Sequence, residues 1–526
     1  VEDVGIVAIA GFGTGQHVAD VSRRFGDAGV VLVLETDLSL LKAVLSRIDF
    51  TGCIAPGSVR IVDQVDPATI SRELAGLDAL AMLGLRVLEH PASRPRLEGG
   101  GEAFAASLQE YVANARTNVA TTLVRSAHTL ENQLANLPAF ALGSGIEDLR
   151  NAAEGRPAIV VSAGPSLRRN IDLLAGEGVR DRFVIIATQT TVKPLLAAGV
   201  APHFVTALDY HEVSRRFHEG LDPRDLEDTE LVIDPKVNPA VPEAWPGRVR
   251  CIPCDPLDRI LGPLARGGGP FPAGATVAHL CHQLGRHLGC DPIVLVGQDL
   301  GFTDGLYYAP GNAIHEVWTP EFNDFNTIET MEWERIVRHR GSLVEREDIH
   351  GRRIYTDGQM LSYLRIFETI FLSEQDRGLR IVDASEGGVR KAGTTCAPLA
   401  EVLATEGTGN EPPLAFPRSE ETSSEVSGVA ARLEAVAREG AEVRRNSLEA
   451  SGILKRMLDD QSDDVAMRRH FTELDGLRDA VARIAEARRL VDLVNQVAVF
   501  KRQRADRRIK LDGDLQALDQ IGRAHV

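Results

Sequence analysis

This chain of 526 residues has few cysteines, no excess of positive charge and no long hydrophobic run. Six cysteines do not make a disulfide framework in a protein of this size, and they are consistent with a reducing compartment. The formal net charge of −17 argues against a protein that wraps nucleic acid or lies on an anionic membrane. It says little about small anionic ligands, which a few local donors can hold.

No apolar run approaches the roughly 18 residues that are needed to span a bilayer. The first residues, Val1-Glu2-Asp3, lack the basic and apolar regions of a signal peptide. We therefore expect a cytoplasmic protein. Hydrophobic residues make up 44% of the chain and charged residues 25%, which is a globular composition, and the length predicts about three domains.

Residues 1–95 are predicted to form a Rossmann-like α/β domain. An apolar strand at residues 6–10 precedes Gly11-Phe12-Gly13-Thr14-Gly15 and a helical pattern, and a second strand at residues 30–34 ends on Glu35. This is the order of a nucleotide-binding βαβ unit, in which the acid can hold a ribose. The alternative is that the glycines only allow close packing of the helix on the sheet.

The rest of the chain is predicted to divide into four parts. Residues 96–155 form a helical connector, and residues 156–395 form a central α/β domain with most of the candidate chemistry. Residues 396–428 are loose and rich in Gly, Pro, Ser and Glu, which indicates a linker. Residues 429–526 are poor in Gly and Pro and carry apolar stripes, which predicts a helical bundle domain.

Five predicted strands of the central domain each end on polar residues. Because the carboxyl ends of parallel strands share one edge of a sheet, these residues predict a ligand-binding crevice there. The polar residues are Ser162–Ser166, Gln189–Thr190, Asp209, Asp234 and Gln298–Asp299.

The turn from Ser162 to Ser166 is the best candidate for an anion site. A strand passes into a helix there, so backbone N–H groups at the helix start are free to bind a phosphate. Gly164 allows close approach, Pro165 suits the first helical turn, and Ser166 can cap the helix or donate its hydroxyl. No Gly-Lys-Ser/Thr follows, so a kinase-type P-loop is unsupported. The alternative is an ordinary strand–helix turn.

The other strand ends offer ligands of several kinds. Gln189 and Thr190 could hydrogen-bond a base or a ribose. Asp209 and Asp234 could hold ribose hydroxyls or a divalent metal, or could only cap the following turns. The carboxylate in Gln298-Asp299 could bind an acceptor hydroxyl or an amino sugar.

A helix that begins near Thr276 presents a further hydroxyl, which could donate to a bound anion. His279 and His282 have a spacing that is open to metal binding, but no acidic third ligand lies nearby in the sequence, which favours histidines that face the surface. Cys251 and Cys254 form a lone C-x-x-C pair, and a zinc ribbon needs a second pair.

Four segments of the chain resemble the motility-associated-factor (Maf) glycosyltransferases, bacterial proteins linked to placing pseudaminic or legionaminic acid on Ser and Thr of flagellin. They are PAIVVSAGPSLRRN, FVIIATQTTVKPLLAAGVAPHFVTALD, GATVAHLCHQLGRHLGCDPIVLVGQDLGFTDG and IVDASEGGVRKAGT. The central domain is also similar to 6-hydroxymethylpterin diphosphokinases and to bacterial sialyltransferases that use CMP-sialic acid. The resemblance implies a sialyltransferase-like central α/β domain, a variant of the GT-A fold, between a Rossmann-like domain and a C-terminal helical domain.

The resemblance also implies roles for individual residues. It implies a donor nucleotide bound by Ser162, Gly164, Pro165, Ser166, Gln189, Thr190, Asp209, Thr276 and Gln298. Asp299 would lie near the transferred sugar. The family commonly has a His a few residues after Gln-Asp-Leu, where this chain has Tyr307-Tyr308. His315 could replace that base, or Tyr308 could bind the phosphate, so we take Asp299, Tyr308 and His315 as catalytic candidates.

From these features we expect a glycosyltransferase that moves a nonulosonic acid from its CMP conjugate to Ser or Thr of flagellin or another surface protein. The resemblance implies no metal and no cofactor beyond the CMP-activated sugar. We expect no nucleic-acid or membrane partner, and the helical domains are candidates for a homo-oligomer interface. One alternative is a 6-hydroxymethylpterin diphosphokinase-like enzyme that uses ATP and magnesium, with the metal held by Asp209, Asp234 and Asp299. The other is a non-catalytic flagellin-binding scaffold.

Overall fold

The computed structural model describes residues 4–491 apart from 26–28, 55–57, 66–68, 71–72, 75–76, 78–79, 82, 270, 273, 317, 410–411, 419–425, 485–486 and 488–490. The chain forms two compact units. The first contains residues 1–127 and 435–526, and the second contains residues 128–434. The predicted α/β class with parallel sheets is confirmed, because each unit contains one parallel sheet.

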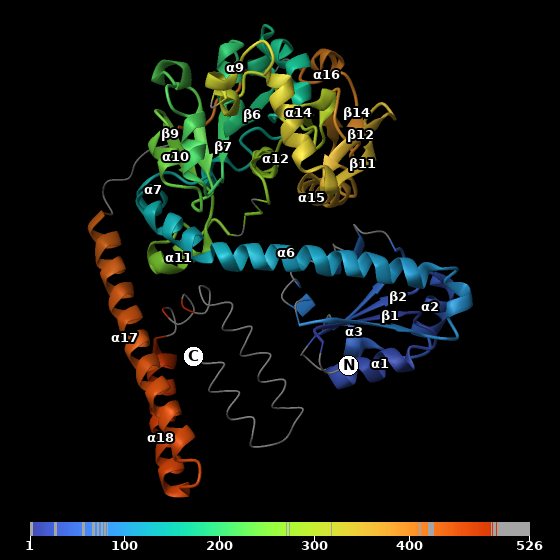
Figure 1. The fold of residues 1–526 in the computed structure, drawn as a ribbon, viewed down its shortest axis with the longest axis vertical. Coiled ribbons are helices and arrows are strands. Elements are labelled where there is room, and N and C mark those ends of the chain that lie inside the picture. The colour runs from blue at the N-terminus through green and yellow to red at the C-terminus, as the bar shows by residue number, and fades with distance from the viewer. Residues whose placement is uncertain are drawn as a thin grey trace. The chain divides into compact units, whose positions relative to one another are not determined.

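The first unit contains a four-stranded parallel sheet (Figure 1). Across the sheet the strands are β3 (Val59–Val62), β2 (Val30–Leu34), β1 (Ile6–Ala10) and β4 (Leu85–Glu89). Val18 of α1 (Gln16–Phe25) packs on one face, and Phe104 and Leu108 of α6 (Gly100–Ala135) pack on the other. The order β3-β2-β1-β4 is one that doubly wound folds also have. Helices α2 (Leu38–Leu45) and α3 (Thr51–Ile54) connect β2 to β3.

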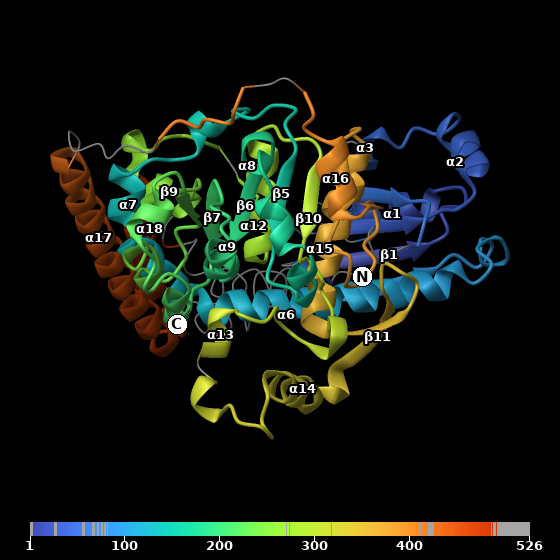
Figure 2. The same cartoon turned by 90° about the horizontal axis from the view of Figure 1, so that it is seen from above.

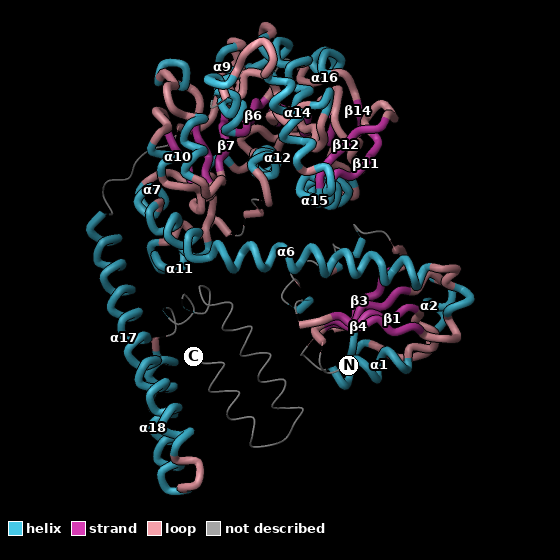
Figure 3. The backbone as a smooth tube through the Cα atoms, in the orientation of Figure 1, coloured by secondary structure: helices cyan, strands magenta, loops and turns pink. Residues whose placement is uncertain are grey.

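The second unit contains an eight-stranded parallel sheet, whose strands are magenta in Figure 3 and can be followed from β9 to β10 in Figure 2. Its order is β14 (Thr395–Cys396), β13 (Ile381–Asp383), β10 (Ile293–Val296), β5 (Ala158–Val161), β6 (Val184–Thr188), β7 (Phe204–Ala207), β8 (Glu230–Ile233) and β9 (Arg248–Cys251). Strands β5 to β8 and β10 are wholly buried. Parallel strands covered on both faces read as continuous apolar runs, which is why the sequence predicts them well.

Two helices contribute to the main core of this unit. Leu280, Cys281 and Leu284 of α12 (Val277–His287) pack with Phe367 and Phe371 of α15 (Gly358–Gln375) and with the strands. The apolar residues of α12 recur every three or four positions, as a helix buried along one side requires. Shorter helices lie before or between the strands in the chain: α7 (Leu137–Leu142) precedes β5, and α8 (Val179–Arg182), α9 (Val192–Ala197), α10 (Ala240–Glu243) and α11 (Asp255–Leu261) follow later strands.

The chain between β10 and β13 adds further elements before α15. They are α13 (Ala313–Glu316), α14 (Ile328–Arg338) and an antiparallel pair of strands, β11 (Leu343–Glu347) and β12 (Arg353–Asp357). Phe302, Ile336 and Met360 form a small separate core within this segment. The segment therefore follows the carboxyl end of β10 and has a packed core of its own.

The stretch 396–428, predicted to be a linker, is partly folded onto the second unit. It contains α16 (Leu399–Thr405), of which Leu399 and Val402 are buried. The ring of Phe416 lies 5.0 Å from that of Phe204, centroid to centroid, and packs on the main core. Isolated apolar residues within a Gly- and Pro-rich stretch give no periodic pattern, so this packing differs from the prediction. Residues 419–425 lie outside the described part of the chain.

The helical part that follows consists of α17 (Val426–Asp459) and α18 (Asp464–Arg483). Asp463 caps α18 by accepting from the N–H groups of Val465 and Ala466. The C-terminal helices are thus confirmed as far as Arg483, and most of the expected bundle beyond them lies outside the described residues. None of the helices described is both long enough and apolar enough to span a membrane.

Candidate active site

The carboxyl ends of β5 and β10 mark the switch point of the eight-stranded sheet. From β5 the strand order continues through β6 to β9, whereas from β10 it continues in the opposite direction through β13 to β14. Loops that leave neighbouring strands in opposite directions create a crevice, and ligands of open α/β sheets bind in such crevices. The two strongest sequence candidates, Ser162–Ser166 and Gln298–Asp299, follow these two strands.

Hydrogen bonds tie these two loops together. The Ser162 hydroxyl donates to Oε1 of Gln298 at 2.6 Å, and the Ser166 hydroxyl donates to Oδ2 of Asp299 at 2.6 Å. The Gly164 N–H donates to the Gly297 carbonyl at 2.8 Å. All four side chains are buried. The structure therefore brings together five of the residues that the sequence selects.

The side-chain carboxylate of Asp299 lies at the N-terminal end of the short 3₁₀ helix Pro165–Arg169. This carboxylate accepts from the Ser166 N–H at 3.2 Å and from the hydroxyl of Thr303. Burial raises the pKa of Asp299 above its ordinary value, and the hydrogen bonds from Ser166 and Thr303 act in the opposite direction. In this arrangement the Ser166 donors are already engaged by Asp299, so the role of the turn in binding a phosphate stays a prediction.

Gly164 is required by this same contact. A Cβ at this position would lie 2.1 Å from Oδ2 of Asp299 and 2.4 Å from the carbonyl oxygen of Gly297. The backbone of Gly164 has φ −64°, so the steric conflict, not an unusual conformation, demands glycine. Pro165 takes the first position of the helix, as its missing N–H permits.

The end of β6 carries Gln189 and Thr190 in a single 3₁₀ turn. The Thr190 hydroxyl lies 2.9 Å from that of Thr188. Gln189 is buried, and its Oε1 has no hydrogen-bond partner among the described residues. Buried carboxamide oxygens are normally satisfied. This oxygen is therefore a candidate acceptor for a ligand group.

The two aspartates farther along the edge cap their own turns. Asp209 accepts from the Ser214 hydroxyl at 2.7 Å and from the His211 N–H at 3.1 Å. Asp234 accepts from the Lys236 N–H at 3.1 Å and pairs with its ammonium at 2.9 Å. In the part of the chain that the structure describes, no group of three His, Cys, Asp or Glu side chains could hold a metal ion.

Thr276 caps α12. Its Oγ1 accepts from the His279 N–H at 3.3 Å and lies 2.7 Å from Nδ1 of the same residue. The His279 ring stacks on Phe367, and burial lowers its pKa to about 3, so the imidazole is neutral near pH 7. His282 pairs with Glu374 at 2.9 Å. Both histidines are completely buried, so the expectation that they face the surface is wrong, because each packs in the core with a structural partner of its own.

The C-x-x-C cysteines are structural as well. Cys251 and Cys254 are buried, and burial raises the pKa of each thiol to about 12. Both thiols are therefore protonated near pH 7 and poorly suited to bind metal or act as nucleophiles.

A loop after β10, residues 305–316, lies against the ends of β5 and β6. The Ala309 N–H donates to the Ala163 carbonyl at 3.0 Å, and Nδ2 of Asn312 donates to the Thr190 carbonyl at 3.2 Å. Tyr308 precedes the first contact, and His315 follows the second by one helical turn. Two catalytic candidates are thus placed on a loop that is tied to the predicted donor-binding turns.

His315 forms a buried pair with a residue that the sequence analysis missed. Its Nε2 lies 2.8 Å from Oε1 of Glu332 on α14, and the Tyr307 N–H donates to Oε2 of that carboxylate at 2.8 Å. Nδ1 of His315 has no partner among the described residues. A signal for Glu332 was present, since it lies midway between Ile328 and Ile336 at four-residue spacing, which places a carboxylate on an apolar stripe.

Arg335, also missed, lies over the tyrosine pair of this loop. Its guanidinium carbon is 4.4 Å from the ring centre of Tyr307 and 5.7 Å from that of Tyr308. Burial raises the pKa of both tyrosines, so their hydroxyls stay protonated near pH 7 and can donate hydrogen bonds. Tyr308 is only half-buried, which leaves part of its surface open.

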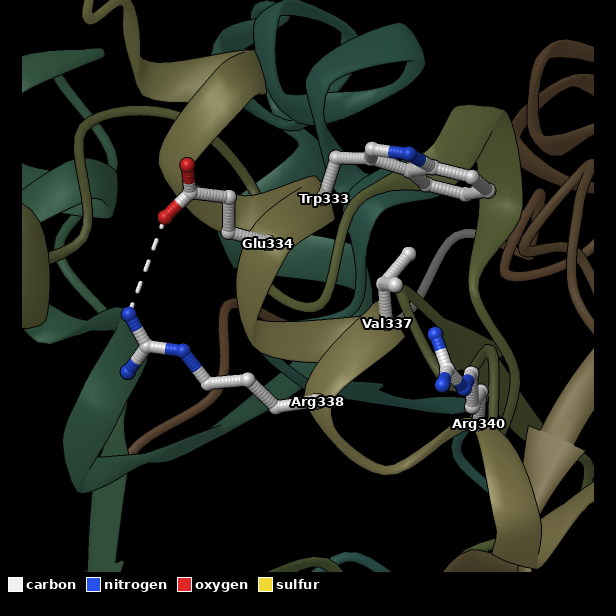
Figure 4. Close-up of a pocket in the computed structure, with 5 residues that line it drawn as sticks. All are labelled: Trp333, Glu334, Val337, Arg338 and Arg340. Atoms are coloured by element: carbon white, nitrogen blue, oxygen red, sulfur yellow. Dashed lines mark ion pairs between the residues drawn. The ribbon is translucent and has the colours of Figure 1, made fainter.

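Helix α14 also borders a pocket of about 460 Å³ (Figure 4). Its lining residues are Trp333, Glu334, Val337, Arg338 and Arg340. Glu334 and Arg338 form an ion pair at 3.6 Å across one turn of the helix. None of the residues that the sequence selects lines this pocket.

The glycine-rich turn of the first unit is hydrogen-bonded to the carboxylate of Glu35, at the end of β2. Oε2 of Glu35 accepts from the N–H groups of Phe12 and Gly13 at 3.0 and 3.3 Å, and Oε1 accepts from Asp37 N–H at 3.1 Å. Glu35 is completely buried. The acid that was expected to be available to a ribose is instead committed to the turn, which supports the packing alternative for Gly11–Gly15.

Comparison with known proteins gives two matches. Residues 131–305 match the family described as 6-hydroxymethylpterin diphosphokinase MptE-like. The structure of MAf glycosyltransferase from Magnetospirillum magneticum AMB-1 is similar with a TM-score of 0.50 and 15% sequence identity, over 99% of this chain and 77% of that chain. No curated protein matches the sequence. The chain therefore contains an MptE-like segment within a fold that is similar, over nearly its full length, to that of a MAf glycosyltransferase.

Proposed function

We propose that this protein is a glycosyltransferase that moves a nonulosonic acid of the pseudaminic or legionaminic type from its CMP conjugate to Ser or Thr hydroxyls of flagellin or another surface protein. The fold match to a MAf glycosyltransferase and the MptE-like segment support the coarse assignment. The donor and the acceptor come from the resemblance of the four sequence segments.

The observation that carries the proposal is the convergence of three loops at the switch point. The turns after β5, β6 and β10 supply Ser162, Gln189 and Gln298, and the 305–316 loop adds Tyr308 and His315. The Gln189 Oε1 and the His315 Nδ1 are buried without partners among the described residues. Unsatisfied buried acceptors of this kind are costly unless a ligand uses them.

The proposed chemistry needs one base and donors for a leaving phosphate. The acceptor hydroxyl oxygen attacks the anomeric carbon of the sugar, the bond from that carbon to the phosphate oxygen breaks, and CMP leaves. His315, held at Nε2 by Glu332, would accept the proton of the acceptor hydroxyl at Nδ1. The hydroxyls of Tyr308 and Thr276 would donate to the phosphate as its charge develops.

A second candidate function follows from the matched family itself. The MptE-like match at residues 131–305 favours transfer of a diphosphate from ATP to a hydroxymethylpterin, with magnesium. Asp209, Asp234 and Asp299 were the expected metal ligands for that reaction. Each of them has hydrogen-bond partners within its own or a neighbouring loop.

The test is a transfer assay with purified protein, flagellin and a CMP-nonulosonic acid, read by the intact mass of flagellin. Added sugar mass that disappears with His315→Ala would support the proposal. A parallel reaction with ATP, magnesium and hydroxymethyl-dihydropterin is read by release of AMP, and AMP release without sugar transfer would favour the diphosphokinase. Flagellin binding with neither reaction would favour a scaffold.

A further inference from the structure

Arg335 is a half-buried cation that has no ion pair or hydrogen bond among the described residues. Its guanidinium is held over the rings of Tyr307 and Tyr308, whose centroids are 4.7 Å apart. Stacking of this kind fixes the orientation of a guanidinium without using its five N–H donors. The donors of Arg335 are thus left for another partner.

Several other cations of the second unit have carboxylate partners, while others, such as Arg180 and Arg182, bond backbone carbonyls. Arg169 pairs with Asp304 at 2.7 Å, and Lys391 pairs with Asp383 at 2.7 Å. Arg338, one turn beyond Arg335 on the same helix, pairs with Glu334. Arg335, by comparison, has neither kind of partner among the described residues.

Glu332, the buried carboxylate of α14 that precedes Arg335, already has hydrogen-bond partners. Glu332 is one helical turn before Arg335, a spacing at which side chains commonly meet. Its Oε1 is bonded to His315 and its Oε2 to the Tyr307 N–H, so both oxygens have partners. The helix thus places a satisfied carboxylate and an unpaired guanidinium beside the same tyrosine-bearing loop.

That loop connects Arg335 to the candidate active site. Tyr308 is adjacent to Ala309, whose N–H is bonded to Ala163 in the turn after β5. The charge of Asp209, at the end of β7, also acts on the Tyr308 hydroxyl. The guanidinium is therefore linked, through the Tyr307–Tyr308 pair, to a loop that is bonded to the turn after β5.

We propose that Arg335 is a substrate-binding residue that holds an anionic group of the donor, and this rests on the proposed function. A CMP-nonulosonic acid carries two such groups, the phosphate and the sugar carboxylate. Both present paired oxygens that match the planar fork of a guanidinium. The tyrosine pair keeps that fork in place before the ligand arrives, which reduces the ordering cost of binding.

The test measures binding by calorimetry to the full chain and to Arg335→Gln, with Arg338→Gln as the matched control on the same helix. The probes are CMP against cytidine and N-acetylneuraminic acid against its methyl ester. We expect Arg335→Gln to weaken one charged probe by about tenfold or more while its uncharged counterpart is unaffected. Loss with CMP assigns the phosphate, and loss with the sugar acid assigns the carboxylate.

Equal affinities of Arg335→Gln and Arg338→Gln for both charged probes would overturn the inference and leave the glycosyltransferase proposal intact. If the wild-type protein binds neither CMP nor the sugar acid, the proposed donor is wrong, and pyrophosphate becomes the probe. Arg335-dependent binding of pyrophosphate would then support an anion site for another substrate, and its absence would overturn the site. Should Arg335→Gln fail to fold, Arg335→Lys keeps the charge and stem but loses the fork, and binding equal to wild type would count against the proposal.

Discussion

The imidazole of His315 and the carboxylate of Glu332 form a buried pair, with Nε2 and Oε1 2.8 Å apart. A carboxylate accepts a hydrogen bond from an imidazole N–H, so Nε2 is the donor in this pair, and an imidazole that carries a single proton has its lone pair on Nδ1. Because Oε2 of Glu332 is held by a backbone N–H, the carboxylate cannot rotate away without losing a second bond. The pair therefore fixes which nitrogen of His315 can accept a proton.

Glu332→Gln should test this arrangement. The amide can still hydrogen-bond the imidazole but no longer selects its tautomer. We expect kcat of sugar transfer to fall by about tenfold or more with KM for the donor little changed, and His315→Ala to lower kcat by about 100-fold or more. Steady-state kinetics would check this, with Glu334→Gln, exposed on the same helix, as the control. A fall in kcat for Glu334→Gln of the same size would show that the effect is not specific to the pair.

Gly164→Ala should disturb the contact between the two switch-point loops. The new methyl group would overlap the Asp299 carboxylate, so we expect a loss of about 1–3 kcal/mol in the free energy of unfolding. Gly341→Ala meets no atom within 4 Å and should change that free energy little. Urea unfolding of both variants checks the prediction, and equal stabilities would mean that the loops separate easily.

Three buried histidines predict that the second unit is destabilised by acid. Burial lowers the pKa of His203 to about 3, of His218 to about 4 and of His279 to about 3, against 6.5 in the unfolded chain. The folded state then binds fewer protons, so the stabilisation is present above pH 6.5 and is lost as the pH falls toward 4. Each histidine contributes up to about 1.4 kcal/mol per pH unit.

This pH dependence can be measured by urea unfolding at pH 7, 6 and 5. His279→Gln should reduce the slope of unfolding free energy against pH, because one of the three histidines no longer titrates. His339→Gln, which removes an exposed histidine, should leave the slope unchanged. An identical slope for wild type and His279→Gln would contradict a neutral buried imidazole at residue 279.

Glu35→Ala should open the glycine turn of the first unit. Three backbone N–H groups lose their acceptor, at a cost of about 1–3 kcal/mol. We expect faster amide hydrogen exchange at Phe12 and Gly13 by mass spectrometry. Asp63→Ala, at an exposed position of the same unit, should exchange like wild type. Unchanged protection in Glu35→Ala would show that the turn does not depend on its carboxylate.

Local patterns predict the strands and the sheet edge, while pairings across long distances escape them. Strands β5, β6 and β10 are short apolar runs, and the polar residues that follow them meet at one edge, as parallel pairing requires. The partner of His315 could not be read in this way, because Glu332 belongs to a helix that comes after an irregular loop. The packing of Phe416 on the sheet was also missed, because a single aromatic ring in a Pro-rich stretch gives no periodic pattern.

The engagement of Ser166 by Asp299 also lay beyond the sequence. A Ser in a strand–helix turn is equally suited to a phosphate or to a protein carboxylate, and only the pairing of β5 with β10 decides which one is present. The roles of Ser166, Tyr308 and Thr276 toward a donor accordingly stay predictions.

Ser166 and its partner Asp299 are 133 residues apart in the chain, and the strands that carry them are immediate neighbours in the sheet. A ribosome that adds 5–20 residues per second therefore completes the turn after β5 roughly 7–27 s before it makes the carboxylate that fills it. During that interval the nascent chain has a growing sheet with β5 as an open edge. An intermediate of that kind is exposed to mispairing, and a binding factor that covers β5 until residue 293 and those after it are made would protect it.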